Sequence, residues 1–201
     1  MTTATRHTRS SSTHVSWDGA PDLGSGLERR SRAGTIGLAG LRLAIGFQFL
    51  WAFLDKLLGL GYATPSAKAW IHGGAPSKGF LSSVSGGPLK GFFHSLAGAT
   101  GMDTLFMAGL LGIGVALLLG VALRPAAVAG GVLLMMMWFA VWPPATLAAG
   151  VPTHSNNPVV DDHVISTFAL VVIAALAGSS AGWLGRRWSA LPLVRQHAWL
   201  R

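Results

Sequence analysis

The chain has 201 residues, of which 51% are hydrophobic and only 11% are charged. Soluble domains carry about 25% charged residues, so this composition argues against a water-soluble globule. The formal net charge is +8 and there is no cysteine, which excludes disulfides, cysteine-ligated iron–sulfur clusters and thiol redox chemistry carried by this chain alone.

The first part of the chain, residues 1–33, is rich in Ser, Thr, Arg and Gly. Segments of this kind bury too little apolar surface to fold, so we expect a disordered tail. The tail has no short apolar region followed by a small-residue cleavage site, and so it does not resemble a cleaved signal peptide.

Four apolar stretches follow the tail, and the last three contain no charged residue. About 20 apolar residues in a helix cross the hydrocarbon core of a bilayer. Only helices and closed barrels satisfy all of their backbone groups in lipid. We therefore predict an all-α, polytopic membrane domain over residues 34–188, a bundle of four transmembrane helices. The expected spans are residues 36–60, 104–123, 126–147 and 164–184.

Arginines gather before the first span, between the second and third spans, and after the fourth. In a four-span chain these three places lie on one side, which the positive-inside rule makes cytoplasmic. We expect a protein of the cell membrane with both termini in the cytoplasm, including a basic C-terminal tail, residues 189–201. Anionic lipid explains the tail charge better than nucleic acid, because the chain has no recognisable nucleic-acid reader motif.

The first outer segment, residues 61–101, is too long for a turn and too apolar for a disordered linker. We expect one or two short amphipathic helices here, at the outer interface. Two roles remain open for them: a lid over a cavity between the spans, or a simple surface anchor. In the second span Ala108, Gly112, Ala116 and Gly120 recur every fourth residue, a stripe that predicts close helix packing in lipid.

Ionisable residues inside an apolar stretch are costly and indicate function by default. Arg42 and Lys56 are 14 positions apart in the first span, on nearly one helix face with Phe49 and Phe53 between them. No acidic residue lies at the depth of Arg42 in the other spans. Its guanidinium must therefore meet backbone carbonyls, a lipid phosphate reached by snorkelling, or a bound polar ligand.

Lys56 lies near the outer end of its span, in the layer that also holds Asp55, Asp103 and the Asp161–Asp162–His163 sequence. One aspartate is enough to cap the fourth helix, and a structural ion pair with Lys56 is one interpretation. The alternative is a proton-handling cluster beside an apolar pocket, the combination that a quinone requires. A metal site from His154, Asp161 and His163 fits no standard ligand spacing, so no metal is predicted. The candidate catalytic residues are Lys56, Asp162 and His163, and the candidate quinone-binding residues are Arg42, Phe53, Lys56 and Trp138.

These motifs resemble the DoxX/DoxD family over residues 34 to about 188. Residues 42–56 resemble the opening helix of that family, as do the loop 73–81 and the run 109–114, and residues 157–163 resemble the entry to its fourth helix. Proteins of the DoxD type form the membrane subunit of a thiosulfate:quinone oxidoreductase, which joins two thiosulfates into tetrathionate. The resemblance implies a quinone, a partner subunit that this chain does not contain, and a set of site residues: Arg42, Lys56, Asp161, Asp162 and His163.

The broader family also includes membrane anchors of oxidative-stress complexes. A non-catalytic scaffold or accessory subunit of a respiratory complex is therefore the alternative that the resemblance allows. A scaffold requires the apolar outer segment and the stripes of small residues. It does not require Lys56, Asp162 or His163.

Overall fold

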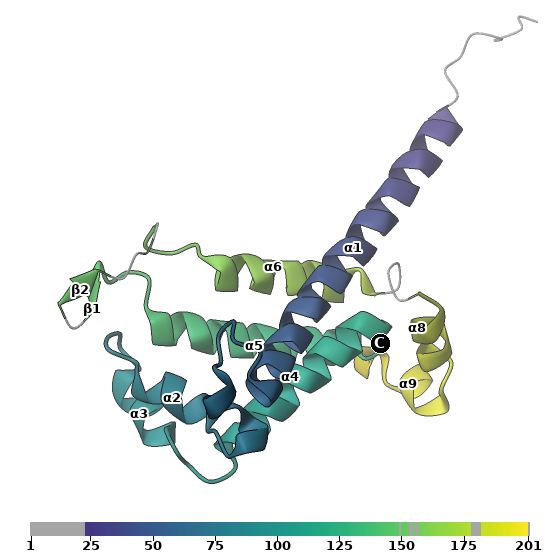
Figure 1. Cartoon of the computed structure of the whole chain (residues 1–201). Helices are drawn as coiled ribbons and strands as arrows, with labels where there is room; N and C mark the ends of the chain where they lie inside the picture. The colour runs from purple at the N-terminus through teal and green to yellow at the C-terminus, as the bar shows by residue number, and fades with distance from the viewer. Residues whose placement is uncertain (1–22, 149, 153–154, 156, 178–181, 201) are drawn as a thin grey trace, which may run out of the picture.

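A computed structural model describes residues 23–148, 150–152, 155, 157–177 and 182–200 (Figure 1). Residues 1–22 of the predicted tail, His154 and residues 178–181 of the fourth expected span lie outside this part. The regular secondary structure of the described chain is helical, as predicted, except for two short strands that pair antiparallel, β1 (Leu147–Ala148) and β2 (Val151–Pro152).

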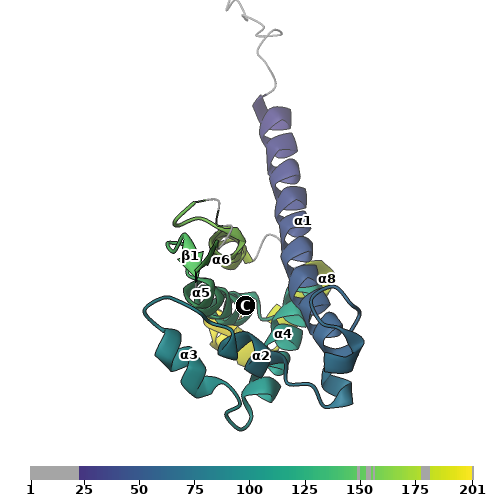
Figure 2. The same ribbon diagram turned by 60° about the vertical axis from the view of Figure 1, so that its left-hand side comes forward.

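The first helix, α1 (Leu23–Leu58), begins earlier than expected and continues without a break into the first apolar stretch. Residues 23–33, predicted to be disordered, are therefore helical, because extending a helix costs far less than nucleating one. At its other end, Gly59 has a φ of 67° and donates its N–H to the Asp55 carbonyl, which ends the helix. The beginning of α1 projects beyond the other helices, and the helix packs against them from Leu38 onward (Figures 1 and 2).

The segment after α1 folds into four short helical elements on the side of the molecule away from α8 and α9 (Figure 1). Leu81 and Phe93 from this segment are buried in a second, smaller core that also includes Ala140. Asp103 ties the segment to the next long helix, because its Oδ1 accepts hydrogen bonds of 2.7 Å from the N–H and the hydroxyl of Ser77. The elements are η1 (Ser66–Lys68), η2 (Trp70–His72), α2 (Pro76–Ser82) and α3 (Lys90–Leu96).

Two long apolar helices follow, α4 (Met102–Leu119) and α5 (Leu123–Val141). Pro125 falls in the first turn of α5, where a missing N–H is tolerated, so this helix begins before the expected residue 126. It also ends before the expected residue 147. The physical reason is that Trp142 has a left-handed φ of 51° and is followed by two prolines, which cannot continue a helix.

The fourth apolar stretch begins as α6 (Asp162–Ala175), which is shorter than the expected span 164–184. The chain then forms α8 (Gly182–Ser189), α9 (Pro192–Gln196) and η3 (Ala198–Leu200). Of these elements, α8 contacts α4, and η3 packs against α5, where Arg124 donates a hydrogen bond of 2.7 Å to the carbonyl of Ala198.

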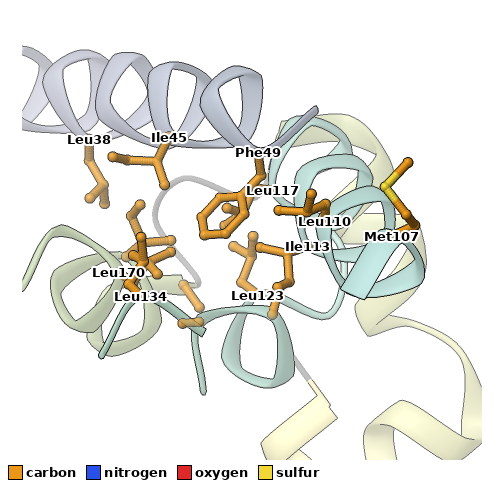
Figure 3. Packing of buried hydrophobic residues seen from close by; sticks show 14 residues of the cluster. Leu38, Ile45, Phe49, Met107, Leu110, Ile113, Leu117, Leu123, Leu134 and Leu170 are labelled. Carbon is orange, nitrogen blue, oxygen red and sulfur yellow. The ribbon is translucent and has the colours of Figure 1, made fainter. Parts of the chain in front are cut away.

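The main core lies where α1, α4, α5 and α6 meet, with Phe49 of α1 directed toward the other helices (Figure 3). The closest approach of α1 and α4 depends on Gly46 and Gly114. A Cβ on Gly114 would lie 2.8 Å from the backbone nitrogen of Leu50, and a Cβ on Gly46 would lie 3.0 Å from Leu117. The stripe of Ala108, Gly112 and Ala116 does not make this contact; it lines an open groove of about 290 Å³ between α4 and α5.

Three helical segments are long and apolar enough to cross a membrane: Arg32–Leu58 of α1, and the helices α4 and α5. Only 28% of the apolar window of each is buried within the protein, so most of their side chains face outward. Exposing this much apolar surface to water is unfavourable, and the arrangement is compatible with a membrane protein. By its length of about 21 Å, α6 alone is shorter than a hydrocarbon core.

Candidate functional site

The residues that the sequence marks as candidates lie in three separate places. The side chain of Arg42, in α1, reaches the C-terminal end of α4. Lys56 lines a pocket beside the segment 63–83. The remaining candidates lie at the beginning of α6: Asp161, Asp162 and His163. Within the described residues, the predicted outer cluster is therefore divided.

Arg42 is buried, with 7% of its surface exposed, and it interacts with the C-terminal end of α4. Its guanidinium donates hydrogen bonds to the carbonyls of Leu117 and Leu118, the second of them at 3.0 Å. The last carbonyls of a helix lack intrahelical partners and carry partial negative charge, so a cation there is stabilising. Of the three partners that the sequence leaves open for Arg42, the structure shows backbone carbonyls. These hydrogen bonds give Arg42 a structural role, and its buried Nε has no hydrogen-bond partner within the described residues.

The aspartates that the sequence places near Lys56, Asp55 and Asp103, accept hydrogen bonds from backbone N–H groups. The carboxylate of Asp55 is buried and accepts hydrogen bonds from the N–H groups of Tyr62 and Ala63, at 3.2 and 3.0 Å. In the described chain Lys56 forms no ion pair with Asp55, Asp103 or any other carboxylate. Its half-buried side chain faces a pocket instead, and no described residue of α6 lines that pocket.

Asp161 and His163 form an oriented pair at the beginning of α6. The sequence predicts a capping aspartate here, and this is confirmed: Oδ1 of Asp161 accepts the N–H of Val164 at 3.1 Å. Its other oxygen lies 2.8 Å from Nδ1 of His163. Since a carboxylate only accepts hydrogen bonds, Nδ1 carries the proton and Nε2 keeps its lone pair in the neutral ring. The His163 side chain is 13% exposed, so this Nε2 belongs to a largely buried ring.

Asp162 plays a smaller part in this arrangement. Its side chain is 77% exposed, and Oδ1 lies 3.4 Å from Nδ1 of His163. One ligand atom from each of Asp161, Asp162 and His163 falls within 4.8 Å of the others, a spacing that a metal ion can bridge. Because Nδ1 of His163 and the Asp161 carboxylate already pair with each other, the geometry is that of an oriented histidine.

An apolar groove of about 740 Å³ runs between α5 and α6, and we call it the α5–α6 groove. On α6 its lining includes Thr167 and Val171, which follow His163 at helical spacing on the same face. The hydroxyl of Thr167 donates to the carbonyl of His163 at 2.8 Å, so the groove begins one turn from the oriented histidine. Arg124 closes the lining at the opposite end.

Trp138 lies near the histidine end of this groove. Its indole N–H donates to the carbonyl of Val159 at 2.9 Å, and its ring packs edge-on against Phe139, which lines the groove. Phe53, in contrast, packs against the main core. Of the four predicted quinone-binding residues, only Trp138 is placed beside the α5–α6 groove.

Sequence reasoning missed the residues that line the groove: Met135, Met136, Phe139, Thr167 and Val171. The run of three consecutive methionines, residues 135–137, was the available signal, because flexible thioether side chains adapt to irregular apolar ligands. A groove between two helices depends on how both are rotated, which no single span reveals.

The fold and these sites define a helical protein with three helices long enough to span a membrane and an apolar groove beside an oriented histidine. None of the protein-family models, curated proteins or solved structures with which the chain was compared matches it.

Proposed function

We propose that this chain is a membrane subunit of a quinone-linked oxidoreductase of the DoxX/DoxD type, located in the cell membrane. In this proposal α1, α4, α5 and the α6 stretch form a four-helix transmembrane bundle, with α2 and α3 as amphipathic helices at the outer face and both termini in the cytoplasm. The observation that carries the proposal is the α5–α6 groove, which begins one turn from the oriented His163.

The groove has the size and chemistry that a quinone ring and part of its isoprenoid tail require. Its volume of about 740 Å³ lies in the range of small-molecule sites, and its lining is dominated by aliphatic, Met and Phe side chains. Val128, Val132 and Val171 on its rim are more than half exposed, so the groove is open toward the surrounding lipid. A carrier that diffuses in the membrane could enter it from the side.

A quinone supplies an acceptor for two electrons and two protons. His163 is suited to hydrogen-bond a carbonyl at the end of the groove and to transfer a proton there, because Asp161 accepts its Nδ1–H and fixes the orientation of the ring. Asp161 acts in this proposal as the positioning residue, and Trp138 borders the same end.

A small sulfur anion such as thiosulfate is the proposed electron donor at the outer face. Joining two thiosulfates into tetrathionate releases two electrons, which together with two protons convert a quinone into a quinol. With no cysteine in the chain, these electrons pass directly or through a cofactor of a partner subunit. Membrane lipid and that partner subunit complete the proposed assembly.

Photo-crosslinking in lipid nanodiscs tests the quinone site. An azido-quinone should label peptides from residues 131–139 and 163–171, and excess unlabelled quinone should compete. Gly131→Leu should reduce labelling at least tenfold, because Gly131 lines the groove and a leucine there would fill it. An added Cβ makes only an ordinary contact with Cγ2 of Thr167, at 3.7 Å, so the first atom of the new side chain is accommodated. The matched control is Gly112→Leu, which fills the separate groove between α4 and α5 and should leave labelling unchanged.

Equal labelling of the two leucine variants, or labelling that excess quinone does not compete, would count against the quinone site. The scaffold alternative is favoured by the exposed apolar surface near the beginning of α1, where Ile36 is 66% exposed. Stable capture of partner proteins without any quinone, unaffected by replacing Lys56, Asp162 and His163, would establish that alternative.

A further inference from the structure

A second cavity, which we call the lysine pocket, lies where the end of α1 meets residues 63–83. It has a volume of about 490 Å³, and its lining includes Lys56, Lys68 and His72 together with the buried Thr64. Lys56 comes from the last turn of α1, whereas Lys68 and His72 come from η1 and η2. Three basic side chains, each from a different helical element, therefore border one cavity.

No carboxylate belongs to the described lining of the lysine pocket. The nearest one along the chain, Asp55, directs its oxygens to the N–H groups of Tyr62 and Ala63. Neither Lys56 nor Lys68 forms an ion pair within the described residues. The charge of the adjacent Asp55 acts favourably on Lys56, but within the described residues its carboxylate forms no ion pair with the half-buried ammonium group. A bound anion would supply the ion-pair partner that this group lacks.

His72 presents a defined edge to the pocket. Its Nδ1 lies 2.8 Å from the carbonyl of Ser66, which can only accept, so Nδ1 carries the proton. The remaining Nε2 can accept a hydrogen bond from a protonated oxyanion or, in the charged ring, donate one. The hydroxyl-bearing Thr64 adds a further group of the kind that hydrogen-bonds oxyanions.

Two glycines hold the walls of the pocket in close contact. A Cβ on Gly74 would lie 2.0 Å from the carbonyl oxygen of Lys68, and a Cβ on Gly59 would lie 2.5 Å from Cα of Ser66. Only a residue without a side chain allows these backbone segments to touch. The backbone that carries Lys68 and His72 is therefore held against the end of α1.

We propose that the lysine pocket binds a small tetrahedral oxyanion of the sulfate and phosphate class. Two lysines match its negative charge and its several acceptor oxygens, and Nε2 of His72 can accept a hydrogen bond from a protonated form such as hydrogen phosphate. The anion can be free in solution or can be the phosphate of a lipid headgroup, because the pocket lies at the end of an apolar helix. The inference rests on the proposed function only for assigning this anion the role of electron donor; binding itself requires no quinone.

Calorimetric titration of the full chain in micelles of a phosphate-free maltoside detergent tests the site with sulfate, thiosulfate and phosphate at constant ionic strength. We expect saturable binding that Lys56→Gln and Lys68→Gln each weaken at least tenfold, whereas Lys56→Arg retains it. The matched control is Lys90→Gln, which removes the same charge from α3, outside the pocket. Nanodiscs containing phosphatidylglycerol distinguish the two sources, because a bound headgroup would compete with the free anion in the wild type.

Binding that is equal in wild type and Lys56→Gln, or that falls equally in Lys90→Gln, would overturn the proposal. Circular dichroism of each variant verifies that the helices are intact. Since this titration omits quinone and the crosslinking experiment omits oxyanions, failure of one proposal is distinguishable from failure of the other.

Discussion

At the scale of single residues, the charged groups near the ends of the helices pair mainly with the backbone. Arg42 donates to the carbonyls that end α4, Asp55 accepts two N–H groups of the following loop, and Asp161 caps α6. Orphan backbone groups at helix ends carry partial charges, so they stabilise a nearby ionised side chain without a second one. Lys56, in the last turn of α1, differs from these residues because it forms no ion pair within the described residues, and only the charge of the adjacent Asp55 acts on it.

Replacing Arg42 tests its structural role. Arg42→Met keeps much of the volume but removes the donors to Leu117 and Leu118, and we expect a loss of about 1–3 kcal/mol in the free energy of unfolding. Denaturant titration in detergent measures this loss. The control Arg32→Met removes an exposed arginine from the same helix and should change the stability by less than about 0.5 kcal/mol. Similar losses for both variants would show that the contact with α4 contributes little.

At the scale of helices, two kinds of contact organise the molecule. Gly46 and Gly114 bring the backbones of α1 and α4 together, whereas α5 and α6 pack around Gly130, whose added Cβ would lie 2.9 Å from Leu170. Close backbone approach allows extensive van der Waals contact, which is the main source of helix association in lipid. The stripe of Ala108, Gly112 and Ala116 remains open, so small residues alone do not identify the packed face.

A matched pair of alanine variants in α4 separates these faces. Gly114→Ala should lower the free energy of unfolding by about 1–3 kcal/mol, because its Cβ would force Leu50 and α1 away. Gly112→Ala meets no atom within 4 Å and should be neutral or stabilising by up to about 1 kcal/mol, since alanine favours the helix. The same denaturant titration compares the two. Equal effects would mean that the α1–α4 crossing does not limit stability.

At the scale of the whole molecule, the two ends of the helices differ in character. One end has the short helices α2 and α3, the lysine pocket and the beginning of α6, and the other has the arginine-containing α8 and α9 (Figure 1). The histidine end of the α5–α6 groove and the lysine pocket thus both belong to the first end, although separate residues line them. A division of this kind matters if the molecule lies across a membrane, because each end then faces a different compartment.

Single-cysteine labelling tests this topology, and the absence of native cysteine makes it direct. Ser85→Cys lies between α2 and α3, and Ala190→Cys follows α8; both positions are exposed. In intact cells a membrane-impermeant maleimide should label Ser85→Cys, and it should label Ala190→Cys only after the membrane is permeabilised. Ala33→Cys, at the beginning of the first span, should behave like Ala190→Cys if the chain crosses four times. Labelling of Ala190→Cys in intact cells would instead indicate three crossings.

The amino-acid sequence by itself determined the helical class, the three long apolar helices and the aspartate cap of α6. Each of these depends on local composition and spacing, so it can be derived from a single stretch of the chain. Helix ends were less predictable where a neighbouring residue decided them, as the left-handed Trp142 and the two following prolines did for α5.

Only the tertiary structure decided which polar residues share a site. Lys56 and His163 were expected in one layer, yet Lys56 faces His72 and Lys68 while His163 pairs with Asp161 beside the α5–α6 groove. Depth along a span follows from counting residues, but lateral position depends on how each helix is rotated and crosses its neighbours. That rotation is set by long-range contacts such as Gly46 against Gly114, which become defined only when the helices pack.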